Sequence, residues 1–295
     1  MRSTRICALI AAASLTAVTT ASVSGQSATP APVDLVGLLA RVGERVEAYY
    51  QRAQSIVCTE IVRFEMMDRN FKVDAPVRRL AYELRISREK ADEGAAAPEA
   101  NVLRTLKTVN GKPPRPGDEP KCLDPKSVSL DPLSFLLPQH QAEYKFTYKG
   151  IGKAGDGHTG VMIDYAPITK KPPEFVWTDS CFSIEAPSRT TGRLWIDRFG
   201  GDILRIDETM LGPIDITVPR VQERKSGISS LTLDRTEVSI RYKMVTFTEP
   251  NEIVLLPELL EEMVVTTGAG VPRQRTTHTF SGYQRFVTSG KLVDP

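Results

Sequence analysis

The stretch that most resembles a chemical motif is GIGKAGDGHTG, residues 150–160. Its glycines match the dinucleotide-binding pattern G-x-G-x-x-G twice, starting at Gly150 and again at Gly155. A nucleotide site of this kind needs a strand before the glycines and a helix after them, because the N–H groups at the start of the helix hold the phosphate. The strand-like run EYKFTYK comes before, but the run that follows, VMIDYAP, is rich in β-forming residues and ends at a proline. We therefore predict a hairpin loop here and no nucleotide cofactor.

The histidines do not form a recognisable catalytic or metal-binding set. His140, His158 and His278 lie in separate contexts, and none has a second His or Cys at metal-ligand spacing. His278 alternates with Thr276 and Phe280 on one strand face, which is typical of a structural histidine. The G-x-S-x-G elbow of α/β-hydrolases is absent. A hydrolase is therefore the least favoured function.

The acidic pair Asp197 and Asp202 flanks the tight turn RFGG, and two carboxylates close together are what a glycosidase needs. Aspartates in turns more commonly accept hydrogen bonds from their own backbone. We predict a turn at this place, and we expect no catalytic residue, no metal site and no cofactor in the chain.

Apolar and aromatic side chains are the remaining candidates for a binding site. An antiparallel sheet that curves round a helix can leave a cavity between the two, and such cavities bind apolar ligands. The candidate lining residues are Phe135, Leu136, Leu137, Trp177 and Trp195. The alternative is that these five side chains belong to an ordinary core.

Three cysteines follow residue 25, namely Cys58, Cys122 and Cys181. In an oxidising compartment two of them are expected to form a disulfide, which leaves the third as a buried or free thiol. Cys122 and Cys181 both stand in segments rich in Pro, Asp and Ser, whereas Cys58 belongs to the strand-like run IVCTEIV. We predict a bridge between Cys122 and Cys181, and the other two pairings stay open.

The N-terminal residues explain why an oxidising compartment is expected. Two arginines precede an apolar run from Ile6 to about Val18, and small residues suited to signal-peptidase cleavage follow. We expect a signal peptide over residues 1–25 and a disordered linker over residues 26–32. The apolar run is shorter than the about 20 residues that span a membrane. The predicted location is therefore periplasmic or secreted, with no integral membrane span.

The charge of the chain does not indicate a nucleic-acid partner. Without residues 1–25, which hold two arginines and no acid, 36 basic residues face 36 acidic residues. Nucleic-acid binders gain much of their affinity from clustered Lys and Arg that neutralise phosphates. The densest basic stretch is interrupted by Glu83 and Glu89, and we interpret it as a solvated strand face. Its basic residues are Arg78, Arg79, Arg85, Arg88 and Lys90.

Hydrophobic periodicity predicts one helix followed by many strands. Apolar residues recur every three or four positions over residues 33–54, which predicts an amphipathic helix with Asp34 as its N-cap. Strict alternation over residues 80–87 and 237–244, and noisier alternation elsewhere, predicts strands with one wet face. Short turns join many of these runs, and strands joined in this way must be antiparallel.

We expect a mainly β (α+β) fold, in which a single long antiparallel sheet curves inward as a half-open barrel. The N-terminal helix and a short helical insert are expected to pack on its concave face. The insert is DPLSFLLPQH, residues 131–140, where Asp131 caps the helix and Pro132 begins it. No linker separates two self-sufficient cores, so we expect a single domain over residues 33–290.

Two segments carry a family resemblance. GRLWIDRFGGDILRIDETML, residues 192–211, forms a hairpin pattern in which G-x-L-W-I-D is followed by a glycine turn and I-L-R. YKMVTFTEPNEIVLLP, residues 242–257, has the pattern of long strands that end in L-P. Together they resemble the LolA-like and RseB-like group of the periplasmic lipoprotein-carrier superfamily. The resemblance implies an incurved antiparallel sheet closed by helices over an apolar cavity, and it assigns no functional residue.

We therefore expect an exported, non-enzymatic binding protein that holds a lipid, an acyl chain or another apolar ligand in the concave face of its sheet. The alternative is an envelope protein-protein interaction module with a solid core and no small ligand. The interior separates the two, because a carrier needs an apolar void of roughly a few hundred cubic ångströms.

Overall fold

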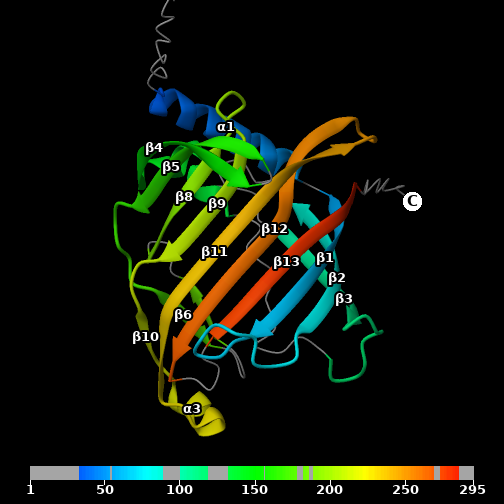
Figure 1. Ribbon diagram of the computed structural model, residues 1–295, viewed down its shortest axis with the longest axis vertical. Helices are drawn as coiled ribbons and strands as arrows, with labels where there is room; N and C mark the ends of the chain where they lie inside the picture. Colours follow the sequence, from blue (N-terminus) through cyan, green and yellow to red (C-terminus); the bar gives the residue numbers. More distant parts are fainter. Residues whose placement is uncertain are drawn as a thin grey trace, which may run out of the picture. The chain divides into compact units, whose positions relative to one another are not determined.

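In the computed structural model, eleven strands pair into one large antiparallel sheet (Figure 1). Within the residues that the structure describes, the sheet is open, with β3 at one edge and β4 at the other. The predicted mainly β fold, a single antiparallel sheet that does not close, is confirmed. The described residues are 33–53, 55–88, 100–118, 132–155, 157–177, 182–185, 189–268 and 273–285.

The strand order is β3-β2-β1-β13-β12-β11-β9-β8-β5-β4, and β10 pairs with β11 beside this path. Most pairs join strands that are close in sequence, but β1 pairs with β13, the first strand with the last (blue and red in Figure 1). The strands of this sheet are β1 (Ile56–Met66), β2 (Arg78–Arg88), β3 (Ala100–Val109), β4 (Tyr144–Gly155), β5 (His158–Pro167), β8 (Thr190–Ile196), β9 (Ile203–Met210), β10 (Ile214–Thr217), β11 (Ser230–Phe247), β12 (Glu252–Thr267) and β13 (Arg273–Arg285). A separate two-stranded ribbon consists of β6 (Glu174–Trp177) and β7 (Phe182–Glu185).

The described residues, from 33 to 285, belong to one compact unit. The expected signal peptide and linker lie outside the described residues. The boundaries of the predicted domain therefore stay a prediction.

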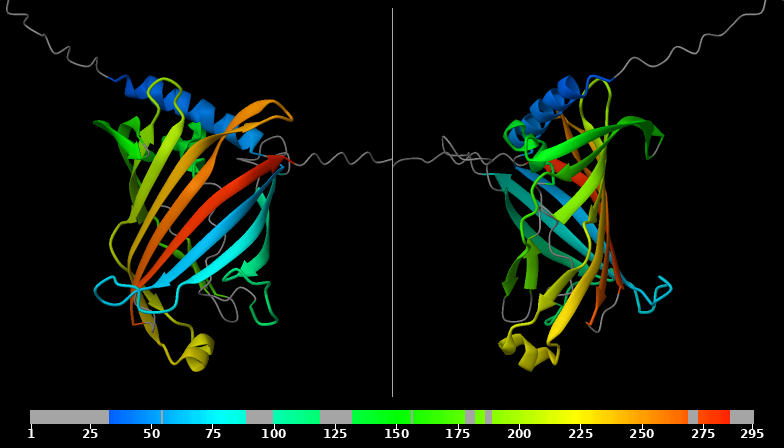
Figure 2. Two further views of the ribbon diagram at one scale, coloured as in Figure 1. Left: turned by 45° about the vertical axis from the view of Figure 1, so that its right-hand side comes forward. Right: turned by 90° about the vertical axis from the view of Figure 1, so that its left-hand side faces the viewer.

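The predicted N-terminal helix is α1 (Leu35–Arg52). The side chain of Asp34 accepts a hydrogen bond from the backbone N–H of Gly37 at 3.0 Å, as expected of an N-cap. Figure 2 shows α1 lying across one end of the sheet in both views. The helix turns one stripe of buried residues toward the core, which is the usual source of stability for an amphipathic helix. The stripe comprises Leu38, Val42, Gly43, Val46, Tyr49 and Tyr50.

The short helical insert differs in detail from its prediction. A 3-10 turn, η1 (Ser134–Leu136), precedes α2 (Pro138–Gln141), whereas the sequence predicted one helix starting at Pro132. Leu137 between them has ψ 142°, because the ring of a following proline pushes a residue out of the helical region. The side chain of Gln141 then donates a hydrogen bond to a backbone carbonyl of α1 at 3.0 Å.

The predicted hairpin is present, but most of the glycine-rich stretch is paired: residues 150–155 end β4 and residues 158–160 begin β5. Gly150 and Gly155 adopt positive φ angles of 109° and 122°, which favour glycine, and the register shifts at both positions. The second strand follows directly, so the helix that a nucleotide site requires is not there.

At the end of the sheet away from α1, residues 214–226 form β10 and the helix α3 (Arg220–Ser226) (Figure 1). Gly227 ends α3 in the left-handed conformation, with φ 72°. No clear periodic signal in the sequence marks either element.

Side-chain alternation gives the sheet two different faces. On β1 the side chains of Ile56, Cys58, Glu60, Val62 and Phe64 are buried, and most of the intervening ones are more exposed. We call the face that carries these five side chains and packs against α1 the inner face, and the opposite face the outer face.

One row of inner-face positions crosses the sheet and shows how closely its strands approach. Tyr165 of β5 passes over Gly192 of β8, and its hydroxyl donates a hydrogen bond to the carboxylate of Glu208 on β9. A Cβ at Gly192 would lie 2.7 Å from that hydroxyl and even nearer to the carbonyl oxygen of Asp207. Only glycine fits here without a shift of its neighbours.

Gly192→Ala should therefore lower the free energy of unfolding by about 1–3 kcal/mol, because the added methyl overpacks a site bounded by backbone. Gly152→Ala is the control: its Cβ meets only the side chain of Met162, which can move. Urea denaturation of both variants measures the difference. A Gly192→Ala protein as stable as the Gly152→Ala protein would contradict the crossing of Tyr165 over β8.

Candidate functional site

Apolar side chains fill the space between α1 and the inner face of the sheet. An apolar void of about 30 Å³ lies among α1, β1, β2, β11, β12 and β13. A second space, of about 60 Å³, lies between α1 and the β11–β12 hairpin. Both are far smaller than a lipid cavity of roughly a few hundred cubic ångströms. An acyl chain can therefore enter this region only if α1 or the insert moves outward.

The five predicted lining residues do not come together at one cavity. Phe135, Leu136 and Leu137 are buried in the core that α1 covers. Trp177 packs in a second apolar cluster, around β10. Trp195 lies on the outer face of β8.

Alternation along β8 explains the position of Trp195. Leu194 and Ile196 point into the core, so the tryptophan between them faces the other way. The guanidinium of Arg205 covers its ring at 4.9 Å from the ring centre, and the side chain is only 8% exposed. Trp195 is therefore buried by its neighbours on the outer face. It does not contribute to the apolar core beneath α1.

Cys58 is a free thiol in the packed interior, where it lines the void of about 30 Å³. Burial, together with the charge of Glu60, raises the pKa of this thiol to about 12. The thiol therefore stays protonated and unreactive at neutral pH. The predicted bridge between Cys122 and Cys181 lies outside the described residues.

Within the part of the chain that the structure describes, a hydroxyl of this interior lacks a hydrogen-bond partner. Tyr242, on the inner face of β11, is 7% exposed, and its Oη has no partner among the described residues. Burial and the neighbouring Tyr49 raise its pKa well above the ordinary value. Tyr49 and another neighbour, Tyr283, line the void of about 30 Å³. An unpaired buried hydroxyl costs about 1–3 kcal/mol, so such a group calls for an explanation.

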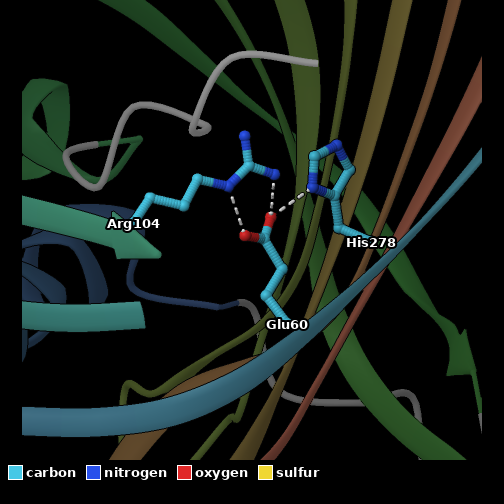
Figure 3. A network of polar contacts seen from close by, with 3 residues as sticks. All are labelled: Glu60, Arg104 and His278. Carbon is cyan, nitrogen blue, oxygen red and sulfur yellow. Dashed lines mark hydrogen bonds and ion pairs between the residues drawn. The ribbon is translucent and has the colours of Figure 1, made fainter. Parts of the chain in front are cut away.

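A charged network farther along the inner face joins side chains of β1, β3 and β13 (Figure 3). Glu60 accepts a hydrogen bond from Nε of Arg104 at 2.7 Å and another from Nη2 at 3.0 Å. The Nδ1 atom of His278 lies 2.6 Å from the same carboxylate. The guanidinium of Arg104 also stacks over the ring of Tyr82, 3.9 Å from its centre, and so crosses β2. The ring of His278 is thus buried and has a polar partner within the fold, which is what the strand pattern predicts.

The network keeps a buried carboxylate ionised. Glu60 and His278 are each 1% exposed. Burial alone would raise the pKa of Glu60, but the hydrogen bond of His278 and the charge of Arg104 outweigh it and hold the pKa below its ordinary value. Each oxygen of Glu60 already accepts at least one hydrogen bond, so the group is better suited to holding three strands together than to transferring protons.

Two further carboxyl groups on the inner face behave in the opposite way. Burial raises the pKa of Glu208, although the hydrogen bond from Tyr165 partly offsets it. Burial also raises the pKa of Glu262, which the charge of His278 partly offsets. Glu262 lies opposite Thr276, one inner-face position along from His278. In the folded protein, ionisation of Glu208 or Glu262 therefore costs more free energy than ionisation of Glu60.

The sequence did not predict that four charged residues lie on the inner face, namely Glu60, Arg104, Glu208 and Glu262. A signal was present for Glu60, because it has the same phase as Ile56 and Val62 in an alternating strand. A charged residue in the apolar phase predicts a buried partner, although it does not say which one.

The outer face of β8, β9, β11 and β12 holds a groove of about 700 Å³. Its charges pair with one another: Arg193 lies 2.6 Å from Asp164, and Arg205 lies 2.7 Å from Asp207. Partly exposed pairs of this kind contribute little free energy. We interpret this groove as a solvated sheet face.

The remaining sequence candidates have local roles. Asp197 accepts hydrogen bonds from the backbone N–H groups of Phe199 and Gly200, as predicted for a turn aspartate. His140 contacts Glu143 at 3.1 Å, and His158 is exposed at the start of β5. In the described part of the chain, no three His, Cys, Asp or Glu side chains are grouped so that they could hold a metal. The helices found there are all too short or too polar to cross a membrane.

Comparison with known proteins adds a weak likeness. No family model and no curated protein sequence matches the chain. Among solved structures, a LolA superfamily protein from Nitrosomonas europaea aligns over 87% of this chain and 97% of its own, at 9% sequence identity. The TM-score is 0.34, so neither a residue role nor an activity is carried over.

Glu60→Gln should lower the free energy of unfolding by about 3–5 kcal/mol, because it leaves the largely buried guanidinium of Arg104 without a counter-charge. Glu83→Gln is the control, since Glu83 pairs with Arg85 and Lys107 on the outer face in solvent. The decrease in the free energy of unfolding should be much smaller for Glu83→Gln than for Glu60→Gln. Equal losses in urea denaturation would show that the inner network adds no more than a surface pair.

Glu262→Gln should stabilise the protein at pH 7, and the gain should disappear as the pH falls toward 4. A carboxyl group whose pKa is raised in the folded state costs stability above its unfolded pKa, about 4.3, and costs none below it. Urea midpoints of wild type and variant between pH 4 and pH 8 test this. Glu261→Gln, on the exposed outer face, is the control and should show no such trend. A gain that does not depend on pH would contradict burial of an ionisable Glu262.

Proposed function

We propose that this protein is an exported, non-enzymatic binding protein that takes an apolar chain with a polar head group between α1 and the inner face of the sheet. The observation that carries the proposal is the buried hydroxyl of Tyr242, which has no partner among the described residues and whose neighbours Tyr49 and Tyr283 line an apolar void. The head group of a bound amphiphile would supply the missing hydrogen bond, and its chain would take the place of apolar contacts under α1. A fatty acid has both parts.

The way in which α1 is attached supports this proposal. Polar contacts of α1 involve its exposed side and a backbone carbonyl: Arg45 donates to the carbonyl of Gly200 at 2.9 Å and lies 3.8 Å from Asp202, and Gln141 donates to the carbonyl of Leu39 at 3.0 Å. The buried stripe of α1 packs into the apolar core of the sheet. Apolar contacts have no preferred direction, so an acyl chain can replace them without leaving a polar group unpaired. The small void requires α1 to move outward as the ligand enters.

The export and the lack of enzymatic activity rest on the sequence and on the inner-face chemistry. The N-terminal residues have the features of a secretory signal. The charged group nearest to a catalytic arrangement, Glu60 with His278, is committed to internal hydrogen bonds.

Tyr242→Phe tests the proposal. The purified chain is titrated with a fluorescent fatty acid, and the variant should bind about tenfold more weakly because one buried hydrogen bond to the head group is lost. Its stability without ligand should be equal to or higher than that of wild type, because the variant removes an unpaired hydroxyl. Tyr148→Phe, on an exposed tyrosine of β4, is the control and should bind like wild type.

Failure of the wild-type protein to bind the fatty acid, together with native mass spectra free of co-purified lipid, would overturn the proposal. That result would favour the second candidate, an interaction module with a solid core. The specific observation behind this candidate is the small size of the void, about 30 Å³.

A further inference from the structure

A second hollow, of about 980 Å³, lies on the outer face over β1, β2, β3 and β13. Two rows of paired residues form its floor. Thr277, Arg63 and Arg79 lie opposite one another in the first row. Ile61 and Ala81 form the middle of the second row, with a threonine at each end, Thr279 on β13 and Thr108 on β3. Its volume is within the range of small-molecule sites.

The charges of this hollow are unbalanced. Arg63 and Arg79 lie directly opposite each other on adjacent antiparallel strands, where like charges destabilise the sheet. Arg63 reaches Glu65 at 2.6 Å, but Glu65 also faces Arg275 at 4.0 Å. Arg79 is exposed and has no ion-pair partner among the described residues. None of the described residues that line the hollow is acidic.

The other basic residues of the same strand face are paired. Glu83 lies between Arg85 at 2.9 Å and Lys107 at 3.1 Å. This part of β2 and β3 is a solvated strand face, as the sequence predicts. Arg79 lies six residues before Arg85 on the same face. It differs because no acidic side chain among the described residues forms an ion pair with it.

Neutral donors accompany the two arginines. Asn110 begins the Asn-Gly turn after β3 in a left-handed conformation, with φ 52°. Its side-chain oxygen accepts a hydrogen bond from the backbone N–H of Arg79 at 2.8 Å, which leaves its NH₂ group as a donor. Three threonine hydroxyls complete the set. Two guanidinium groups, an amide and several hydroxyls match the oxygens of a phosphate, because arginine binds such oxyanions with two parallel hydrogen bonds.

We propose that this hollow binds a phosphate group carried on a larger molecule, with Arg63 and Arg79 as the charged contacts and Asn110 as a neutral donor. The rest of the molecule lies over Ile61 and Ala81. The site is on the outer face, so it is independent of the proposed binding of an apolar chain beneath α1. The phosphate can belong to a lipid head group or to a soluble compound.

The experiment uses two probes with the same chemistry. Glycerol 1-phosphate is titrated into the purified chain by calorimetry, with glycerol as the uncharged control. Vesicles of phosphatidylglycerol are tested by co-sedimentation at the same ionic strength. Binding to the vesicles alone assigns the site to a lipid surface, and binding to glycerol 1-phosphate assigns it to a soluble phosphate compound. Binding to neither probe overturns the proposal.

Variants distinguish specific binding of phosphate in the hollow from non-specific electrostatic attraction to basic side chains. Arg79→Gln should weaken binding at least about tenfold, because a charge-assisted hydrogen bond is lost, and Arg79→Lys should lie between it and wild type. Arg85→Gln removes the same charge from the same strand face and should bind like wild type. Matching urea midpoints exclude loss of folding. Equal weakening by Arg79→Gln and Arg85→Gln would overturn the proposal.

Discussion

The pairing of β1 with β13 is the constraint on which the rest of the structure depends. It joins the first strand of the described chain to the last, over ten residue pairs from Ile56 to Met66. Without it, β1, β2 and β3 would form a separate three-stranded sheet. With it, both faces become continuous: the inner face gains the contact of Glu60 with His278, and the outer face gains the row of Thr277, Arg63 and Arg79.

The curvature of the sheet is a second constraint on the inner face. On a concave face, side chains converge, so a long side chain can pass over its neighbouring strand and reach the next one. Arg104 does so over Tyr82 to reach Glu60, and Tyr165 does so over Gly192 to reach Glu208. Both crossings end on a carboxyl group of the inner face. The inner face is therefore held by polar contacts near its two edges and by apolar packing in the region that α1 covers.

Much of the architecture follows from local patterns in the sequence. Alternation and turn residues predict the strands, their antiparallel order and the β4–β5 hairpin, because these depend on residues that are close in sequence. The N-cap Asp34 and the apolar stripe predict α1 in the same way.

The long-range features do not follow from such patterns. Nothing local to residues 56–66 indicates that their partner lies at residues 274–285. The same limit applies to the candidate sites. Glu60 has the phase of the core, but its partners come from β3 and β13, and Trp195 has the hydrophobicity of a core residue but the phase of the outer face. At both positions the hydrophobicity of the side chain and its place in the alternation predict opposite faces of the sheet. Only the assembled sheet shows that the alternation determines the face.

Native-state hydrogen exchange followed by mass spectrometry tests the β1–β13 pairing most directly. If β1 is held between β2 and β13, its amides and those of β13 should exchange together, at the slowest rate in the protein, while the edge strands β3 and β4 exchange sooner. Exchange of β1 as fast as the edge strand β3, with β13 still protected, would mean that the first strand is not paired with the last. The continuous inner and outer faces would then not exist in solution.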